Sequence, residues 1–320
     1  MIKHKTAIFM KKIIVLLSFT FVFNSLVVAQ SRKESKTLLF FYFKGNGEDG
    51  LHIASSKDGM QWAALGNDSS FLMPMVGKDK LMRDPSIIYG PDGFFHMVWT
   101  VSWKERGIGY SRSKDLINWS EQQYLPVMEH EQGAQNCWAP EISYDYEHKS
   151  YFIYWASTIS GRFKETEVPG EKNHRIYSVT TKDFKSFGQT KLLYNKGFNV
   201  IDASIQKYKN GYLMFLKDET KYPTAKKNIL ISYSKNIDGP YSAPSLPITG
   251  NYWAEGPTAV MIKGRWTVYF DKYEAHKYGA VVSNDLKNWE DVSDKLNMPE
   301  GARHGSVIWV NDSIVKKLVR

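Results

Sequence analysis

Short apolar runs alternate with polar, turn-forming segments along most of the chain. The runs are rich in Val, Ile, Tyr, Phe and Trp, and none is longer than about eight residues, which favours strands over helices. Residues 30–320 contain no convincing amphipathic helix pattern. The hydrophobic pattern therefore predicts an all-β fold.

The same pattern recurs five times with a period of roughly 50 residues. Turn signals, most of them followed by an aromatic residue, lie at 56–62, 113–119, 181–187 and 283–289, with a degenerate copy at 234–236. Ahead of these turns lie the strand-like runs 51–54, 107–110, 175–179, 229–233 and 278–282. Further upstream lie the aromatic-rich runs 38–43, 94–99, 151–155, 212–216 and 266–270. Such signals at regular spacing indicate repeated β-hairpins.

One further strand opens four of the five repeats, at residues 84–88, 140–144, 202–205 and 255–260. The first repeat lacks this strand, but residues 304–310 have the same pattern and no repeat follows them. Four strands in each of five units, with the first unit closed by the C-terminal strand, predict a five-bladed β-propeller. The alternatives are a fragment of a double propeller and a β-sandwich, and a sandwich would not explain the split first repeat.

The N-terminal segment is typical of a secretory signal peptide. Lys3, Lys5, Lys11 and Lys12 precede an apolar run over residues 13–29, and small residues near its end suit signal peptidase. We therefore expect a signal peptide over residues 1–29 and a single propeller domain over residues 30–320. The expected location is periplasmic or secreted, with no membrane contact after cleavage. An uncleaved N-terminal anchor is the alternative.

Charge and cysteine content narrow the choice of partners. The chain has 42 basic and 33 acidic residues, and the predicted signal peptide accounts for four of the lysines. The remaining basic residues are scattered rather than clustered, so no nucleic-acid partner is expected. The single cysteine, Cys137, excludes an intramolecular disulfide, so stability must come from a large core. We expect a monomer whose abundant aromatic residues suit a carbohydrate partner.

Acidic side chains stand near the start of the predicted inner strands. They are Asp84, Glu141, Asp202 and Glu255, and His304 is at the start of the C-terminal strand. The first strand of each blade lies nearest the propeller axis, so we expect these five residues to converge on one mouth of the central channel. Carboxylates gathered in this way shift one another's pKa values, as in many active sites.

Four segments resemble the blade-opening motifs of family 43 glycoside hydrolases, which include α-L-arabinofuranosidases and β-xylosidases. They are Arg83-Asp84-Pro85-Ser86-Ile87, Trp138-Ala139-Pro140-Glu141-Ile142, Ile201-Asp202-Ala203-Ser204-Ile205 and Ala254-Glu255-Gly256-Pro257. The resemblance implies hydrolysis of arabinofuranosyl or xylosyl bonds in plant-type polysaccharides or oligosaccharides, with inversion. It implies that Asp84 is the base that activates water, and that Glu255 is the acid. Asp202 would position Glu255 and raise its pKa.

The resemblance also implies residues that bind the substrate. Trp138 and Glu141 would belong to the substrate pocket or its support, and Trp103, Trp253 and Arg303 are further candidates for substrate contacts. His304 resembles a family histidine that lies beneath the site and, in some members, belongs to the water shell of an axial calcium ion. A structural histidine is the alternative for His304. No cofactor is expected to be required, apart from such a structural calcium.

Two departures from the common family pattern bear on the substrate. Ala203 stands where Pro often follows the supporting Asp, and Arg83 precedes the base where a small residue is frequent. Two other functions remain open at this point. One is a retaining hydrolase of fructans or sucrose, which a separation of Asp84 and Glu255 near roughly 5 Å would favour over the roughly 6.5–9.5 Å of inverting enzymes. The other is a carbohydrate-binding propeller without catalysis.

Overall fold

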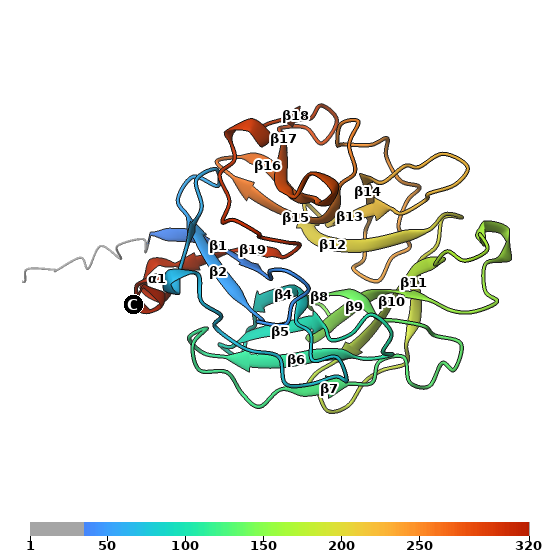
Figure 1. Cartoon of the computed structure of the whole chain (residues 1–320), viewed down its shortest axis with the longest axis horizontal. Helices are drawn as coiled ribbons and strands as arrows, with labels where there is room; N and C mark the ends of the chain where they lie inside the picture. The colour runs from blue at the N-terminus through green and yellow to red at the C-terminus, as the bar shows by residue number, and fades with distance from the viewer. Residues whose placement is uncertain (1–34, 320) are drawn as a thin grey trace, which may run out of the picture. The chain divides into compact units, whose positions relative to one another are not determined.

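The computed structural model describes residues 35–319, so the predicted signal peptide, residues 1–29, lies outside the described residues. The strands form five antiparallel sheets around a common centre (Figure 1). The first sheet contains β19 (Ser306–Asn311), β1 (Lys36–Tyr42), β2 (His52–Ser56) and β3 (Ala63–Ala64), in that order. Its inner strand comes from the C-terminus and pairs with β1 from Phe41↔Ser306 to Lys36↔Asn311. The predicted closure of the first blade is therefore confirmed.

The next three complete sheets follow the predicted order from the axis outward. The second contains β4 (Arg83–Tyr89), β5 (Phe95–Thr100), β6 (Ile108–Ser113) and β7 (Gln123–Leu125). The third contains β8 (Trp138–Asp145), β9 (Ser150–Thr158), β10 (His174–Thr181) and β11 (Lys191–Tyr194). The fifth contains β15 (Glu255–Ile262), β16 (Arg265–Lys272), β17 (Lys277–Ser283) and β18 (Glu290–Asp291). Short 3-10 turns lie at Gly66–Asp68, Lys164–Thr166, Tyr273–Ala275 and Ser293–Lys295.

The fourth sheet has three strands, so the prediction of four strands in every blade is wrong there. It contains β12 (Val200–Tyr208), β13 (Gly211–Asp218) and β14 (Asn228–Ser234). Residues 240–249 run beside β14 but carry three prolines, which cannot donate to a strand ladder. Hydrogen bonds from the amides of Ser242, Ser245 and Ile248 still satisfy carbonyl groups of β14, at 2.8, 2.8 and 2.9 Å.

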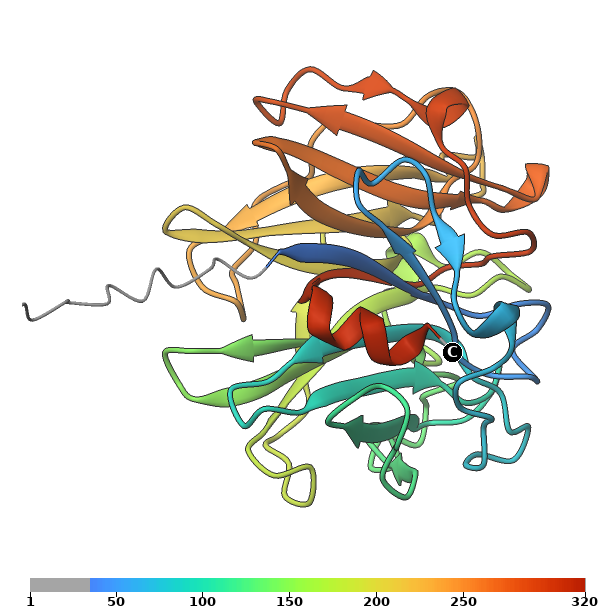
Figure 2. The same cartoon turned by 90° about the vertical axis from the view of Figure 1, so that its left-hand side faces the viewer.

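One α-helix, α1 (Asp312–Leu318), follows β19, which corrects the expectation of no helix. Seven residues are too few to give a clear helical period in a sequence. Tertiary contacts hold the helix instead, because the Asp312 carboxylate accepts hydrogen bonds from Ser35 at 2.5 Å and Thr37 at 2.6 Å. Figure 2 shows α1 beside the first sheet. No helix within residues 35–319 is long and apolar enough to cross a bilayer.

Buried clusters between neighbouring sheets form the core. Leu38 and Phe40 of the first sheet pack with Tyr269 and Ala280 of the fifth, and all four are fully buried. The Tyr269 hydroxyl also donates a hydrogen bond to the carbonyl of Gly59 at 2.7 Å. These contacts join the first and last blades without a disulfide, as the single cysteine requires.

A bulge near the start of four inner strands decides which residues face the centre. The pairing of inner strand with second strand breaks between Arg83 and Ser86, Trp138 and Glu141, Ile201 and Ser204, and Glu255 and Thr258. The first bulged residue has a left-handed φ in every case: Asp84 at 52°, Ala139 at 45°, Asp202 at 53° and Gly256 at 59°. For the three residues other than glycine, backbone strain of this kind costs roughly 1–3 kcal/mol each and is often found at functional sites.

The sequence predicted that the four acidic residues occupy equivalent positions at the strand starts, and the bulges show that this prediction is wrong. Asp84 and Asp202 share the bulged position, whereas Glu255 stands one residue before it and Glu141 two residues after it. The residues before the bulges, Arg83, Trp138, Ile201 and Glu255, all line one cavity. The residues after the bulges, Ser86, Glu141, Ser204 and Thr258, line a different cavity together with Ser306. The bulges therefore separate two sets of side chains along the axis.

Candidate active site

The three acids assigned to catalysis and His304 line the same cavity, which has a volume of about 310 Å³. They come from separate blades: Asp84 from β4, Asp202 from β12, Glu255 from β15, and His304 from the segment before β19. The side chains of Trp103, Trp138 and Trp253 line it too. The predicted convergence on one mouth thus holds for these residues.

Asp84 is held between a hydroxyl group and a histidine. The Thr100 hydroxyl donates a hydrogen bond to Asp84 Oδ2 at 2.8 Å, and His304 Nδ1 lies 3.3 Å from Asp84 Oδ1. Burial disfavours the ionised form, but the hydrogen bond and charge of His304, with help from Arg83 and Thr100, lower the pKa of Asp84 below its ordinary value. Asp84 is therefore ionised at neutral pH, as a general base must be.

Asp202 is more deeply buried than Asp84, and its pKa is shifted in the opposite direction. Its Oδ2 accepts a hydrogen bond from the amide of Gly256 at 2.9 Å and lies 4.0 Å from His304 Nδ1. Burial, together with the nearby charge of Glu255, raises the pKa of Asp202 to about 6, although His304 opposes the shift. Gly256 is required here, because a Cβ atom would lie 2.3 Å from His304 Cγ and the left-handed φ favours glycine.

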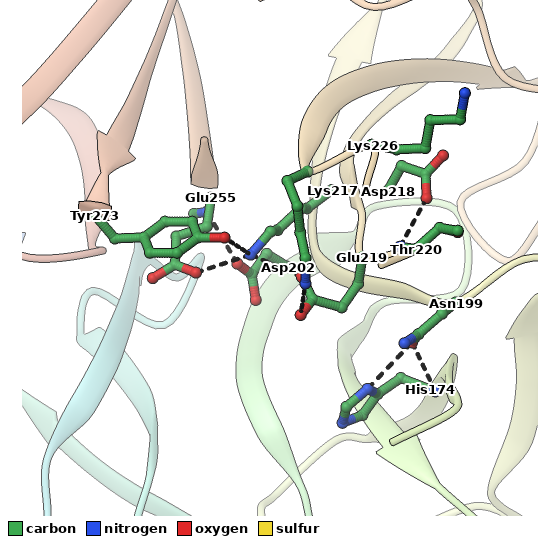
Figure 3. A network of polar contacts seen from close by, with 12 residues as sticks. His174, Asn199, Asp202, Lys217, Asp218, Glu219, Thr220, Lys226, Glu255 and Tyr273 are labelled. Atoms are coloured by element: carbon green, nitrogen blue, oxygen red, sulfur yellow. Dashed lines mark hydrogen bonds and ion pairs between the residues drawn. The ribbon is translucent and has the colours of Figure 1, made fainter. Parts of the chain in front are cut away.

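Glu255 lies between two cations. Lys217 Nζ donates a hydrogen bond to Glu255 Oε2 at 2.9 Å, and Arg303 Nη2 lies 3.7 Å from Glu255 Oε1. Figure 3 shows the Lys217 amine among the carboxylates of Glu255 and Glu219 and the ring of Tyr273. Glu219 Oε2 is 2.7 Å from Lys217 Nζ. These contacts fix the orientation of the Glu255 carboxyl group.

Lys217 and Glu219 were not identified from the sequence. Lys217 is 1% exposed, although an unpaired lysine is almost never fully buried. Burial favours the neutral amine, but the charges of Glu255 and Glu219 outweigh it and raise the pKa of Lys217 above its ordinary value. A lysine at the end of the apolar run Leu213–Leu216 was the available signal, but its partners come from another blade and from the following loop.

Arg303 contacts the carboxylates of Glu255 and Asp271 and does not line the cavity. Its Nε donates a hydrogen bond to Asp271 Oδ2 at 2.6 Å, and Asp271 is 1% exposed. Arg303 is not among the residues that line the cavity of Asp84. This placement suits a residue that positions Glu255, whereas a direct substrate contact stays a prediction.

The three tryptophans present ring surface to the cavity. Trp103 and Trp253 are 41% and 37% exposed, and the rings of Trp103 and Trp138 meet edge to face with centroids 5.4 Å apart. Behind Trp138 lies His174, whose ring centroid is 4.7 Å away and whose pKa burial lowers to about 3. Exposed indole faces can stack on sugar rings, and a role of these tryptophans in substrate binding stays a prediction.

Glu141 lies apart from the other predicted substrate residues. It accepts a hydrogen bond from the Ser86 hydroxyl at 2.9 Å and lines a second cavity of about 660 Å³, not the cavity of Asp84. Burial raises the pKa of Glu141 to about 7, against the opposing charge of His304. The structure therefore does not bring Glu141 together with the tryptophans.

This raised pKa leads to a prediction about stability. Between the ordinary pKa of a glutamate and about 7, the folded protein holds a proton that the unfolded chain has lost, so stability falls as pH rises through this window. Glu141→Gln removes that dependence. The wild type should therefore lose roughly 2–3 kcal/mol of unfolding free energy between pH 5 and pH 8 that the variant does not lose. Urea unfolding of both proteins at the two pH values measures the difference.

The control is Glu147→Gln, which removes an exposed carboxylate from the lining of the same cavity. The prediction would be contradicted if the unfolding free energies of Glu141→Gln and the wild type differed by the same amount at both pH values.

His304 is poorly suited to bind a metal directly. Burial favours the neutral ring, but the hydrogen bond to Asp84 and the charge of Asp202 outweigh it and raise the pKa of His304 to about 9. A protonated imidazole has no free lone pair for a metal. Residues 35–319 also contain no cluster of three or more His, Cys, Asp or Glu side chains placed to hold a metal ion. Direct calcium ligation does not fit this donor set, and contact through a water shell stays a prediction.

Comparisons with known proteins point to one family. The family described as "Probable glycosyl hydrolase domain" (Glyco_hydro_43_rel) matches residues 34–314. An α-L-arabinofuranosidase of Bifidobacterium longum subsp. longum is 23% identical over 168 residues, which are 46% of this chain and 16% of that protein. The chain therefore spans only a small part of this curated relative.

Solved structures share the fold. The crystal structure of an α-L-arabinofuranosidase from Lactobacillus brevis matches with a TM-score of 0.54 and 19% identity, covering 66% of this chain and 72% of that chain. A thermostable family-43 glycoside hydrolase matches with a TM-score of 0.51 and 16% identity, covering 66% of this chain and 71% of that chain. At such low identity these likenesses support the five-bladed fold alone.

Proposed function

The chain belongs to the family of probable glycosyl hydrolase domains related to glycoside hydrolase family 43, and from this membership we propose that it hydrolyses arabinofuranosyl or xylosyl bonds in plant-type polysaccharides or oligosaccharides. One observation carries the proposal: Asp84, Asp202 and Glu255, from three separate blades, line a single cavity that also exposes indole rings. The name of the Bifidobacterium relative makes arabinofuranose the first sugar to test.

In the proposed mechanism, Asp84 and Glu255 act on opposite sides of the bound sugar. Asp84, which is ionised, accepts a proton from a water molecule as the water oxygen attacks the anomeric carbon. Glu255 donates its proton to the leaving oxygen as the glycosidic bond breaks, and inversion results. Lys217 and Arg303 hold the Glu255 carboxyl in place. Asp202 takes no part in bond breaking and positions Glu255 through the backbone at Gly256.

A substrate screen tests this proposal. The protein lacking residues 1–29 is incubated with nitrophenyl α-L-arabinofuranoside, β-D-xyloside, galactoside and galactofuranoside, and proton NMR identifies the anomer that is released first. We expect hydrolysis of the arabinofuranoside or the xyloside with inversion. A retained anomer would assign Asp84 as a nucleophile and overturn the inverting mechanism. Binding of polysaccharide without hydrolysis of any substrate would instead support a non-catalytic propeller.

The remaining proposals concern partners and location. We propose that hydrolysis requires no cofactor, since two carboxyl groups and water suffice for the chemistry. The partner is a carbohydrate, and the protein is proposed to be a monomer that is periplasmic or secreted, with the signal peptide removed by cleavage near residue 29.

A further inference from the structure

Arg83 has a fixed guanidinium group beside the proposed base. Its Cζ atom lies 4.7 Å from the ring centroid of Phe43 and 4.2 Å from that of Trp103. Asn46 Oδ1 accepts two hydrogen bonds at 3.0 Å, one from Arg83 Nη1 and one from Trp103 Nε1. Aromatic faces and a shared acceptor thus hold the planar group in one orientation, which reduces the entropy lost when a ligand binds.

The orientation of Asn46 is itself fixed by a neighbouring carboxylate. Glu48 Oε1 accepts a hydrogen bond from the side-chain Nδ2 of Asn46 at 3.0 Å, and Glu48 Oε2 accepts one from the backbone N–H of Asn46 at 3.2 Å. With its Nδ2 atom used in this way, Asn46 turns its Oδ1 atom toward Arg83 and Trp103. This chain of contacts joins the loop between β1 and β2 to the start of β4.

Arg83 differs from the lysines that line the same cavity. Lys217 pairs with Glu255 at 2.9 Å, Lys221 pairs with Glu171 at 2.8 Å, and Lys227 pairs with Glu219. For Arg83, no ion pair is found with any other residue in the range 35–319, and within that range its Nε and Nη2 atoms have no hydrogen-bond partner. Two donors of the guanidinium fork thus remain available at the cavity.

A second cation, Lys172, lies beside the Trp138 ring but is not among the residues that line the cavity. Lys172 Nζ is 5.8 Å from the ring centroid of Trp138, and its hydrogen bond at 2.9 Å goes to the neutral side chain of Gln135. The Trp103 and Trp138 pair is therefore flanked by Arg83 on one ring and by Lys172 on the other. A neutral sugar gains little from the charge of Arg83 at the cavity, whereas an anionic substituent gains from it.

We propose that Arg83 binds a carboxylate carried by the substrate, so that the substrate contains a uronic acid next to the glycosidic bond that is cleaved. The planar fork of an arginine matches the two oxygens of a carboxylate. The inference rests on the proposed function and specifies its substrate class.

Paired substrates test the inference. The sugar identified by the screen is linked to a uronic acid, and the same oligosaccharide is prepared as the free acid and as the methyl ester, which lacks the charge and carries one additional methyl group. We expect the wild type to hydrolyse the acid with a kcat/KM about 10-fold to 100-fold above that of the ester, as expected for a hydrogen-bonded charge pair. In Arg83→Gln this ratio should fall to about one, and Arg83→Lys should keep part of it.

Arg112→Gln is the matched control, since Arg112 also stacks on an aromatic ring, Phe94, at 4.5 Å, but is exposed and does not line the cavity. This control should keep the wild-type ratio. Equal kcat/KM values for acid and ester in the wild type, or equal losses on both in Arg83→Gln, would overturn the inference. A preference for a sulfate ester over the uronate, lost in Arg83→Gln, would overturn the assignment to a carboxylate.

The outcomes also separate this inference from the proposed function. A wild-type protein that hydrolyses neutral glycosides and shows no preference for the acid would refute the uronate and leave the glycosidase intact. If no glycoside is hydrolysed, binding of the acid and ester to the wild type by calorimetry still decides the question. Tighter binding of the acid that depends on Arg83 supports the site, and equal binding refutes it.

Discussion

Asp84→Asn is expected to lower kcat by about 10²-fold to 10⁴-fold. The substitution keeps the size of the side chain and its contact with Thr100, but an amide cannot accept the proton of the attacking water. Sugar binding should survive, because the tryptophan faces and the other carboxyl groups are unchanged. Kinetics on the substrate found in the screen, together with calorimetric binding of the released sugar, measure the two effects separately.

The control for Asp84→Asn is Asp92→Asn. Asp92 also lies against a histidine, with Oδ1 at 3.0 Å from His96 Nε2, but neither residue lines the cavity. This control should retain wild-type kinetics. A wild-type rate in Asp84→Asn would exclude Asp84 as the base, and a loss of sugar binding in proportion to the loss of rate would assign it a binding role instead.

The fold could be predicted because its strongest signals are local. In the turn after β6, Asp115 Oδ1 accepts hydrogen bonds from the amides of Ile117 and Asn118 at 3.0 and 2.8 Å. Asp285 makes the same contacts after β17, at 2.9 and 2.8 Å with Lys287 and Asn288. Each turn needs only a few consecutive residues, so its sequence signal is repeated wherever the structure repeats. The edge of the fourth sheet is different, because residues 240–249 carry prolines and form separate hydrogen bonds to β14 in place of a strand. The turn signal does not predict this irregular segment.

The convergence of Asp84, Asp202 and Glu255 on one cavity could be predicted, but the register of the acidic residues could not. Asp84 and Asp202 occupy the same bulged position, and a search for acids at strand starts finds both. Glu255 and Glu141 lie on either side of that position, and the bulge sends their side chains to different cavities. A bulge depends on pairing with the second strand, which a single sequence does not display. The position of Glu141 was therefore misjudged although its blade was identified correctly.

The cations around the acids were the least visible part of the site. Lys217 lies on β13, Glu255 begins β15, and Arg303 precedes β19, so the group forms only when three blades meet. The sequence marks Arg83 only as a departure from a family pattern, whereas its lack of a carboxylate partner among residues 35–319 is a property of the folded structure. Charge pairing is decided by tertiary contacts, and the sequence supplies only the candidates.

Glu255→Gln is expected to affect substrates according to their leaving groups. On an oligosaccharide, whose leaving oxygen needs a proton, kcat should fall by about 10²-fold to 10⁴-fold. On a nitrophenyl glycoside the leaving group departs without a proton, so the loss should be much smaller. The nitrophenyl substrate also shows that the variant is folded, which matters because Lys217, 1% exposed, loses one of its two carboxylate partners.

Glu219→Gln removes the other carboxylate partner of Lys217 and is the control for this effect. Because Glu219 is given no role in proton donation, the control should change kcat for the oligosaccharide and the nitrophenyl glycoside by the same factor. The ratio of kcat for the oligosaccharide to kcat for the nitrophenyl glycoside therefore distinguishes a proton donor from a residue that only contacts Lys217. Equal losses on both substrates in Glu255→Gln would remove Glu255 from the role of acid, and would leave Asp202, whose pKa is raised to about 6, as the next carboxyl group to test.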